Sequence, residues 1–324
     1  MGTFLPNLFL NDLVDDFGIW QHTDGTNILY NEGYALDDAA RGLLFTLSNN
    51  DLDRSEVLFS YIIKSQSSDG FYGFANQNRQ FSPIIASDDA TGQVVWAAGY
   101  AVSKNFHNKK ARQLIIDATS SLRSSKYVRG YAYALLGAIY SDEKLANQYY
   151  EELKSFFDKK DDDWPWPESA LRYGNAIVPY AFLRYSFVYS NKIAAKTGCK
   201  ILRFLEERCT HNRQRGPIGN TNGWLPQGTD KVPTYSQQPI DSAYMLWAWL
   251  ASYQLSGDES ERQKANDWMK WFEGDNVAKT QMYDPRNMQC FDGINPESVN
   301  FHSGAESNIC FLLSKYMLDK NITI

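Results

Sequence analysis

Two kinds of predicted helix alternate along the chain, and they differ in where their polar residues lie. One kind is amphipathic, with Lys, Arg and Glu gathered on one face, which is typical of a helix that packs on one side and meets water on the other. We expect these helices on the outside of the fold. Five of them span 54–65, 109–122, 143–157, 192–208 and 259–273, and the N-terminal segment 8–17 supplies a sixth.

The second kind carries Ala, Gly, Tyr and Trp, with few charges after its first turn. A helix that is apolar nearly all round must be buried on nearly every side. Most of these helices are preceded by a short polar stretch that contains an acid, often beside aromatic residues. The six predicted inner helices are 35–47, 89–102, 128–140, 176–189, 240–255 and 304–317.

The inner helices recur at intervals that suit a repeated helical hairpin, with starts near positions 37, 88, 129, 175, 241 and 305. Six hairpins closed into a ring make an all-α (α/α)6 toroid, in which inner helices line the centre and outer helices surround them. An open solenoid is less favoured, because neither end of the chain has a distinct polar capping repeat. We therefore predict one domain over residues 1–324, with segment 8–17 packing beside the last inner helix to close the outer ring.

Charge and motifs exclude several functions. The net charge of -6, without a basic stripe, argues against nucleic acid as a partner. No nucleotide-binding glycine loop or G-x-S-x-G turn is present, and no Cys/His cluster has metal-ligand spacing, so we expect no cofactor and no bound metal. The four cysteines do not suggest a disulfide framework. With no secretion signal and no apolar run long enough to span a membrane, we expect a cytoplasmic protein.

The loops that lead into the inner helices favour carbohydrate chemistry. They are long and rich in Gly, Asn, Trp and Pro, notably 216–239 and 281–303, and a ring would bring their acids to one rim. The chain also holds 9 Trp, 20 Tyr and 18 Phe, whose rings stack on the C–H faces of sugars, although most such rings serve as core. Glycosidic bond cleavage needs two carboxylates and groups that bind hydroxyls.

Glu168 is our first candidate for the proton donor. It follows Trp164 and Trp166 in a Trp-Pro loop, and flanking indoles that exclude water would raise its pKa toward neutrality. Asp88 or Asp89, at the start of an inner helix, suits the base that activates water, because a helix N-terminus favours the charged carboxylate. Both aspartates could equally serve only as helix caps.

Asp241 and Glu306 are further candidates for the second catalytic carboxylate. Glu306 lies four residues after His302, so the two would share a face if that segment is helical. Substrate binding would use acids, aromatic rings for stacking, and amides or an arginine that read hydroxyls. These expected binding residues are Asp37, Asp38, Trp164, Trp166, Arg172, Asn220, Asn222, Trp224, Tyr235, Gln237, Gln238, Asp292 and His302.

Several of these stretches carry a family resemblance. DWPWPESALRYGNAIVPYAFL, GNTNGWLPQG, QQPIDSAYM and YDPRNMQCFDGINPESVNFHSGAES resemble a family of bacterial six-hairpin, (α/α)6-barrel domains, which occur alone or fused behind family 4 glycosyltransferases. The resemblance runs from about Asn31 to the C-terminus. It implies a glycosidase-like fold and a possible association with a glycosyltransferase. The positions that match the acid-bearing motifs of the family are Asp37, Asp38, Asp88, Asp89, Glu168, Asp241, Asp292 and Glu306.

One departure from the family pattern concerns Asp292. Where the resemblance implies a Gly-Gly-Cys-type turn before the aspartate, this chain has Met288, Gln289, Cys290 and Phe291. The chain thus matches the family at Asp292 itself but not in the turn that precedes it.

We expect a glycoside hydrolase that cleaves an oligosaccharide by carboxylate acid/base catalysis. A non-catalytic glycan-binding module that works beside a glycosyltransferase is one alternative, because it needs the same aromatics but no acid pair. A sugar epimerase on the same toroid is another, although paired histidines are expected there and only His302 lies in a motif. A terpene-cyclase-like toroid, suggested by QSSDGFYGF and the Asp88–Asp89 pair, lacks the D-x-D-D run.

Overall fold

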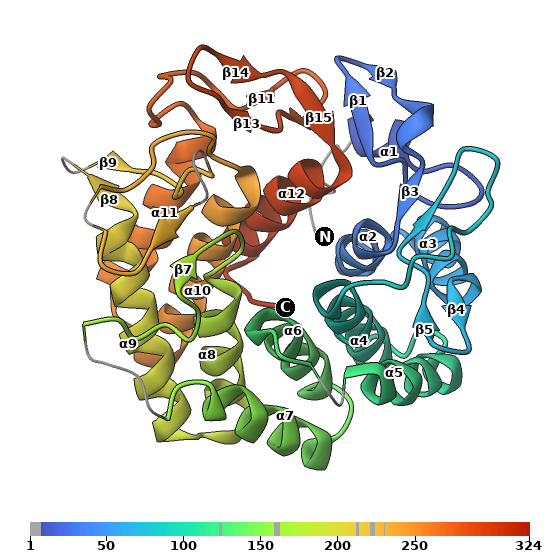
Figure 1. Ribbon diagram of the computed structural model, residues 1–324, viewed down its shortest axis with the longest axis horizontal. Helices are drawn as coiled ribbons and strands as arrows, with labels where there is room; N and C mark the ends of the chain where they lie inside the picture. The colour runs from blue at the N-terminus through green and yellow to red at the C-terminus, as the bar shows by residue number, and fades with distance from the viewer. Residues whose placement is uncertain (1–7, 123–124, 159–162, 212–213, 221–223, 230) are drawn as a thin grey trace.

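Six inner helices form a closed ring, as predicted (Figure 1). The computed structural model describes residues 8–122, 125–158, 163–211, 214–220, 224–229 and 231–324. Each inner helix packs on the next, and the last packs on the first, which closes the (α/α)6 toroid. The inner helices are α2 (Leu36–Ser48), α4 (Asp88–Ser103), α6 (Val128–Ala138), α8 (Ile177–Tyr189), α10 (Pro239–Ser256) and α12 (Ala305–Lys320).

The amphipathic helices form the outer ring, and each packs against the inner helix that precedes it. They are α3 (Leu52–Lys64), α5 (Asn108–Leu122), α7 (Glu143–Ser155), α9 (Lys192–Arg208) and α11 (Glu259–Phe272). The N-terminal helix α1 (Leu8–Leu13) packs against α12 and is shorter than the expected 8–17. Past Leu13 the chain turns, and Asp15 accepts hydrogen bonds from the amides of Phe17 and Gly18.

Four outer helices begin at a side-chain cap. Asp51, Asp142, Asn191 and Asp258 each accept a hydrogen bond from a backbone amide in the first turn that follows. Among the inner helices, only α4 has such a cap, from Ser87. At α2 and α12, a carbonyl from another segment accepts the first helical amide instead: that of Gly73 accepts from Leu36, and that of Gln21 accepts from Ala305.

Short antiparallel ribbons decorate the long loops, and the sequence pattern did not predict them. The pairs are β1 (His22–Asp24) with both β2 (Asn27–Ile28) and β15 (His302–Gly304), β3 (Tyr34–Ala35) with β6 (Phe74–Ala75), β4 (Gln66–Ser67) with β5 (Gly70–Phe71), β7 (Ala170–Leu171) with β10 (Leu225–Pro226), β8 (Thr210–His211) with β9 (Gln214–Arg215), β11 (Tyr283–Asp284) with β12 (Gln289–Cys290), and β13 (Gly293–Ile294) with β14 (Val299–Asn300). A 3-10 turn, η1, spans Tyr30–Glu32.

Aromatic side chains fill the centre of the ring. The ring of Trp96 lies 6.1 to 6.2 Å, between centroids, from those of Tyr133, Tyr180 and Trp247. The last residue, Ile324, is buried, and its amide donates to the hydroxyl of Tyr180. The toroid is therefore a packed core rather than a channel.

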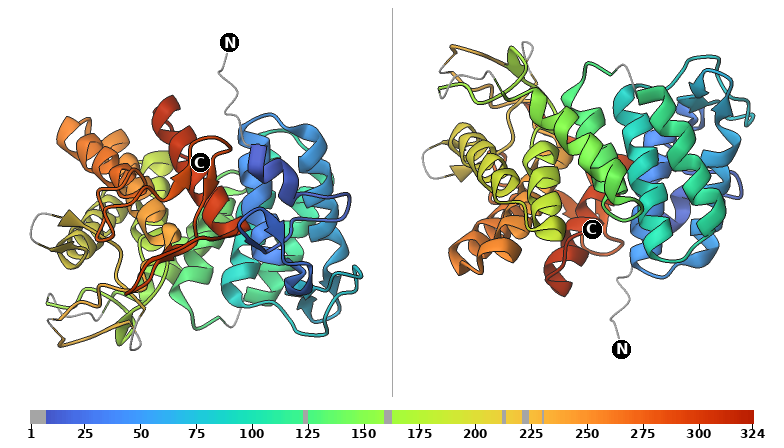
Figure 2. Two further views of the ribbon diagram at one scale, coloured as in Figure 1. Left: turned by 90° about the horizontal axis from the view of Figure 1, so that it is seen from above. Right: turned by 90° about the horizontal axis from the view of Figure 1, so that it is seen from below.

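The inner helices run parallel to one another, because each is separated from the next by one outer helix that runs back. Their N-terminal ends consequently lie at one end of the ring, where the long loops gather (Figure 2). Among the described helices, none combines the length and apolar content needed to cross a bilayer.

Glycines set the spacing of one inner pair, α4 and α6. A Cβ atom on Gly99 would lie 2.0 Å from the carbonyl oxygen of Gly137, and a Cβ on Gly137 would lie 2.1 Å from that of Val95. Backbone thus packs on backbone, with no room for a methyl group. Neither partner atom belongs to a side chain that could rotate away.

We predict that Gly99→Ala lowers the free energy of unfolding by about 3 kcal/mol, as overpacking in a rigid core does. Gly73→Ala is the matched control, because its new Cβ would meet its nearest atom at an ordinary 3.4 Å. Urea denaturation of both variants measures the difference. Equal stability of the two variants would contradict the proposed backbone contact.

Candidate functional site

The acids at the rim lie in the first turns of inner helices, but most of them are not caps. Helices α2, α10 and α12 have no side-chain cap, although Asp37, Asp38, Asp241 and Glu306 stand in their first turns. Their carboxylates still gain from the positive end of the helix dipole. Capping therefore does not explain why these acids are present, and their partners must be sought across the ring.

Arg41 gathers three of these acids. Its guanidinium lies 2.6 Å from Asp38, 2.7 Å from Asp37 and 2.8 Å from Glu306, nitrogen to oxygen, and the residue is only 2% exposed. Because Glu306 belongs to α12 and the others to α2, this cluster joins the last inner helix to the first. Sequence reasoning missed Arg41, although its spacing of three and four residues from two acids on one helix was a usable signal.

One cation cannot neutralise three carboxylates, so the pKa values of Asp38, Glu306 and Arg41 are all raised. Burial, with repulsion from Asp37, raises the pKa of Asp38 to about 8 despite the attraction of Arg41. Burial also raises the pKa of Glu306, which Arg41 partly offsets. Burial opposes the charge of Arg41 itself, but the three acids outweigh it and hold its pKa well above the usual value. The cluster therefore retains a proton at neutral pH.

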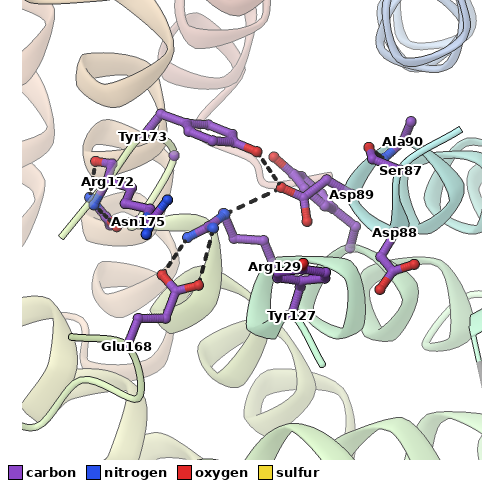
Figure 3. Close-up of polar contacts among 12 residues, drawn as sticks. Ser87, Asp88, Asp89, Ala90, Tyr127, Arg129, Glu168, Arg172, Tyr173 and Asn175 are labelled. Atoms are coloured by element: carbon purple, nitrogen blue, oxygen red, sulfur yellow. Dashed lines mark hydrogen bonds and ion pairs between the residues drawn. The ribbon is translucent and has the colours of Figure 1, made fainter. Parts of the chain in front are cut away.

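Arg129, the second buried arginine, gathers a separate set of groups (Figure 3). Its guanidinium donates to both oxygens of Glu168, at 2.9 and 3.2 Å, and its Nε lies 3.3 Å from Asp89. The hydroxyl of Tyr173 donates to the same oxygen of Asp89 at 2.7 Å. Helices α4 and α6 and the loop before α8 thus meet at one cation, which is 4% exposed and was also missed from the sequence.

The surroundings of Glu168 argue against the proton-donor role. A carboxylate that accepts two bonds from a guanidinium is held as an acceptor, not as a donor. The expected indole shield is also wrong. Trp164 and Trp166 are 4% and 0% exposed, and Trp164 donates to the main-chain oxygen of Glu168 rather than covering its carboxylate. Buried in the core, neither ring can stack on a sugar.

Asp88 and Asp89 point in different directions. Figure 3 shows Asp89 directed toward Arg129 and Asp88 directed away from that group. The carboxylate of Asp88 instead accepts a hydrogen bond from the hydroxyl of Ser125 at 2.6 Å. Of the two expected bases, only Asp89 therefore belongs to the rim.

Asp241 belongs to neither arginine cluster. One of its oxygens accepts a hydrogen bond from the amide of Gly174 at 2.7 Å. Burial raises the pKa of Asp241 to about 7, with Glu306 raising it further and the Gly174 amide and Arg129 opposing. A carboxyl with a pKa near neutrality gives or takes a proton readily at physiological pH.

Asp37, Asp38, Arg41, Asp89, Arg129, Glu168, Tyr173, Asp241 and Glu306 make up what we call the rim site. Solvent reaches it, because the side chains of Asp37 and Glu306 are 34% and 37% exposed. One turn deeper, the hydroxyls of Tyr133 and Tyr244 lie 3.0 Å apart and form a polar floor above the aromatic core.

Asp292 and His302 occupy supporting positions. Asp292 accepts hydrogen bonds from the amide of Gly304 and the hydroxyl of Ser307, which fixes the start of α12. The expectation that His302 and Glu306 share a helix face is wrong, because α12 begins only at Ala305 and His302 lies in β15. His302 is exposed, and its Nε2 lies 3.9 Å from Asp24 on the paired strand β1.

His22 was not predicted and lies closer to the rim site. Its Nδ1 is 3.7 Å from Asp292. Asp292 raises the pKa of His22, against the effect of burial, and Asp38 adds to the rise.

The loop 216–239 places its predicted residues in different environments. Gln237 is 2% exposed and accepts a hydrogen bond from the indole of Trp271, so it is structural rather than hydroxyl-reading. Gln238 precedes α10 and is half-buried. The backbone N–H of Asn220 donates to the carbonyl of Ser236. Asn222 lies outside the described residues.

Trp224, Tyr235 and Arg172 come together beside the rim site. The guanidinium of Arg172 lies over the indole of Trp224, 5.3 Å from the ring centroid. Trp224 and Tyr235 line one cleft of about 480 Å³. Of the expected stacking residues, these two are placed to receive a ligand.

Comparison with known proteins identifies the fold. No model of a protein family matches the sequence, and no curated protein matches it. Solved structures do match, and they include a sugar epimerase from a ruminal bacterium, at 12% identity and a TM-score of 0.73, with 98% of this chain and 96% of that chain covered. The chain has the (α/α)6-barrel fold of these enzymes.

Two further matches span two kinds of sugar chemistry. Cellobiose 2-epimerase from Bacillus thermoamylovorans matches at 9% identity and a TM-score of 0.70, with 95% of each chain covered. The GH76 α-mannanase of Bacteroides thetaiotaomicron matches at 10% identity and a TM-score of 0.63, with 97% of this chain and 93% of that chain covered. At these identities the likeness establishes the fold alone.

The Arg41 cluster leads to a prediction about stability. We expect Arg41→Met to lower the free energy of unfolding by about 3 to 5 kcal/mol at pH 8, because three partly buried carboxylates lose their cation. The loss should be smaller at pH 5, where the acids can neutralise by taking up protons. Guanidinium chloride denaturation of both proteins at pH 5 and pH 8 measures this change in the free energy of unfolding.

The raised pKa of Asp38 also determines whether this group stabilises the unmodified protein more at low or at high pH. Asp38 keeps its proton up to about pH 8 when folded but loses it near pH 4 when unfolded, so the folded state binds more protons in between. The contribution of this group to stability therefore falls as the pH rises from about 4 to 8. Arg286→Met, which breaks an exposed pair with Asp284, is the control and should change stability little at either pH. A pH-independent effect of Arg41→Met would contradict the assignment.

Proposed function

We propose that the protein is a glycoside hydrolase that cleaves an oligosaccharide at the rim site. The observation that carries the proposal is the separation of carboxyl groups by environment, because acid/base catalysis needs one carboxyl with a proton and one without. Asp241 stands apart from both arginines with a pKa near 7, whereas Asp89 is bound by Arg129 and Tyr173. The matches to sugar-processing enzymes with the same fold, which include an epimerase and a mannanase, support carbohydrate chemistry but do not select hydrolysis.

Asp241 would act as the general acid. Its proton would pass to the glycosidic oxygen as the bond to the anomeric carbon breaks, which leaves the departing sugar as a neutral alcohol. The amide of Gly174 holds one carboxyl oxygen, at 2.7 Å, so that the other is oriented for transfer. This assignment replaces Glu168 as the donor and moves Asp241 from a reserve candidate to the central one.

Asp89 would act as the general base. The ring order places α10 opposite α4, so Asp241 and Asp89 approach the substrate from opposite sides. Neighbouring helices pack about 8–10 Å apart, and opposite helices of a six-membered ring lie about twice as far apart. Side chains that reach inward from both would leave room for a sugar and a water, as in inverting enzymes, whose carboxyls are about 6.5–9.5 Å apart. We therefore propose inversion of the anomeric centre.

Arg129 and Glu168 would position the base rather than react. The two bonds from Arg129 to Glu168 orient the guanidinium, and its Nε then faces Asp89. Together with the Tyr173 hydroxyl, it leaves the other oxygen of Asp89 to accept a proton from water.

Replacing Asp241 by Asn should reduce hydrolysis about 10³-fold, since the amide has no proton to give at neutral pH. For the unmodified enzyme, kcat should fall as the pH rises through about 7, because Asp241 must be protonated to act. Reducing-end release from a panel of gluco- and manno-oligosaccharides between pH 5 and 9 measures both. Full activity of Asp241→Asn would remove the proposed acid.

The Asp88–Asp89 pair offers a matched test of the base. Asp89→Asn should lower kcat at least 100-fold, whereas Asp88→Asn should retain nearly full activity, because Asp88 points away from the rim site toward Ser125. Thermal unfolding of both variants controls for folding. Equal loss in the two variants would contradict a specific role for Asp89.

Epimerisation of a sugar is a second candidate, favoured by His22 beside the Arg41 cluster. Asp292 and, more weakly, Asp38 raise the pKa of His22, so its imidazole would serve as a proton-transfer group beside the Arg41 cluster. This function would be selected if the unmodified enzyme epimerises a free sugar and does not hydrolyse oligosaccharides, and if His22→Gln abolishes the epimerisation. Binding of oligosaccharides without any turnover would instead select the glycan-binding module, working beside a glycosyltransferase.

A further inference from the structure

Trp224 differs from every other tryptophan of the chain. Of the nine tryptophans, eight are buried, with at most 6% of each exposed, whereas Trp224 remains partly open to solvent. Its backbone is also in the left-handed region, with φ of 66°. A bulky residue in that conformation is strained and persists only where the surrounding structure holds it. The fold thus keeps an indole at the surface at some cost to stability.

The indole borders a preformed cleft. Trp224, Pro233 and Tyr235 supply its apolar surface, and Thr229, Lys231 and Thr234 supply polar groups around a volume of about 480 Å³. That volume is in the range of small-molecule sites, which combine apolar walls with a few polar groups. An indole face with hydroxyls and an ammonium group at its edge suits a sugar ring, which presents C–H bonds on its faces and hydroxyls at its rim.

The walls of the cleft are held in place from behind. A Cβ on Gly219 would lie 2.0 Å from the carbonyl oxygen of Tyr235, so the backbone at Gly219 is pressed against that residue. The amide of Gly219 also donates to the carbonyl of Pro233 at 2.7 Å. Arg172, which is not among the residues that line the cleft, lies over the indole of Trp224 at 5.3 Å from the ring centroid and supports it. A ligand would therefore meet a rigid site and lose little energy in ordering it.

The cleft connects to the rim site through one short ribbon. Trp224 leads into β10, which pairs with β7, and Arg172 and Tyr173 directly follow β7. The hydroxyl of Tyr173 bonds Asp89, and the next amide, that of Gly174, bonds Asp241. The same segment thus supports Trp224 through Arg172 and contacts both proposed catalytic carboxyls.

We propose that this cleft is a second sugar-binding subsite, distinct from the rim site and occupied by another ring of the same substrate. The inference rests on the proposed function and adds to it the minimum length of the oligosaccharide and the direction in which it extends from the rim site. A disaccharide would fill only the positions on either side of the cleaved bond. A longer chain would reach the cleft as well, so the substrate is an oligosaccharide extended toward the β7–β10 ribbon.

Binding measurements with matched probes test the subsite. Three pairs serve as probes: maltose and maltohexaose, cellobiose and cellohexaose, and mannobiose and mannohexaose. Isothermal titration calorimetry is performed on Asp241→Asn, so that no probe is consumed, with and without Trp224→Ala. For at least one pair, the hexasaccharide should bind at least tenfold more tightly than the disaccharide, and Trp224→Ala should remove that preference, whereas Trp224→Phe should keep most of it.

Phe187→Ala is the matched control. Phe187 is also an exposed aromatic ring with an arginine over it, Arg184 at 5.5 Å, but it lies at the C-terminal end of α8, away from the rim. This variant should keep the full length preference. In the unmodified protein, the preferred hexasaccharide should also protect the emission of Trp224 from acrylamide, since the other tryptophans are already buried.

The outcomes separate the subsite from the hydrolytic function. Cleavage of a hexasaccharide whose binding is unaffected by Trp224→Ala would overturn the subsite and leave the hydrolase proposal standing. A Trp224-dependent length preference without cleavage by the unmodified protein would support the subsite and overturn hydrolysis. An equal loss of affinity for both members of a pair, or no binding of any probe, would overturn the subsite.

Discussion

The balance between two buried arginines and the acids around them is the constraint on which the rim depends. Inner helices surrounded by other helices must be apolar along most of their length, so their polar groups collect at the ends. Arg41 and Arg129 each bring acids from different helices to one point inside the ring. Without these cations, the carboxylates at the rim would repel one another with little water to screen them.

The two clusters leave Asp241 in an intermediate position, and its chemistry follows from that. It is close enough to Glu306 and Arg129 to feel both charges, yet it is paired with neither. Burial then dominates and favours the protonated form. The rim site therefore combines one acid that favours its protonated form with another, Asp89 on the opposite helix, that is bound by a guanidinium.

The loops add selectivity to this rigid frame. The β7–β10 ribbon brings Tyr173 and Gly174 to the carboxylates of Asp89 and Asp241 and brings Arg172 to Trp224, so one segment contacts both the rim site and a residue of the neighbouring cleft. Loops on a packed scaffold can diverge without loss of the fold. This is consistent with this chain sharing its barrel with two epimerases and a mannanase, although it has only about one residue in ten in common with each.

The sequence alone determined the helices and their order, because apolar periodicity and end caps are local properties. Alternation of charged and uncharged helices was enough to give a closed ring, and the first-turn acids were found. Only the tertiary structure decided which acids share a cation. Glu168 looked isolated in its Trp-Pro loop, yet Arg129 from another helix binds it, and Trp166 turned inward to the core. Such pairings depend on contacts between residues far apart in the chain, and the local sequence pattern does not predict these contacts.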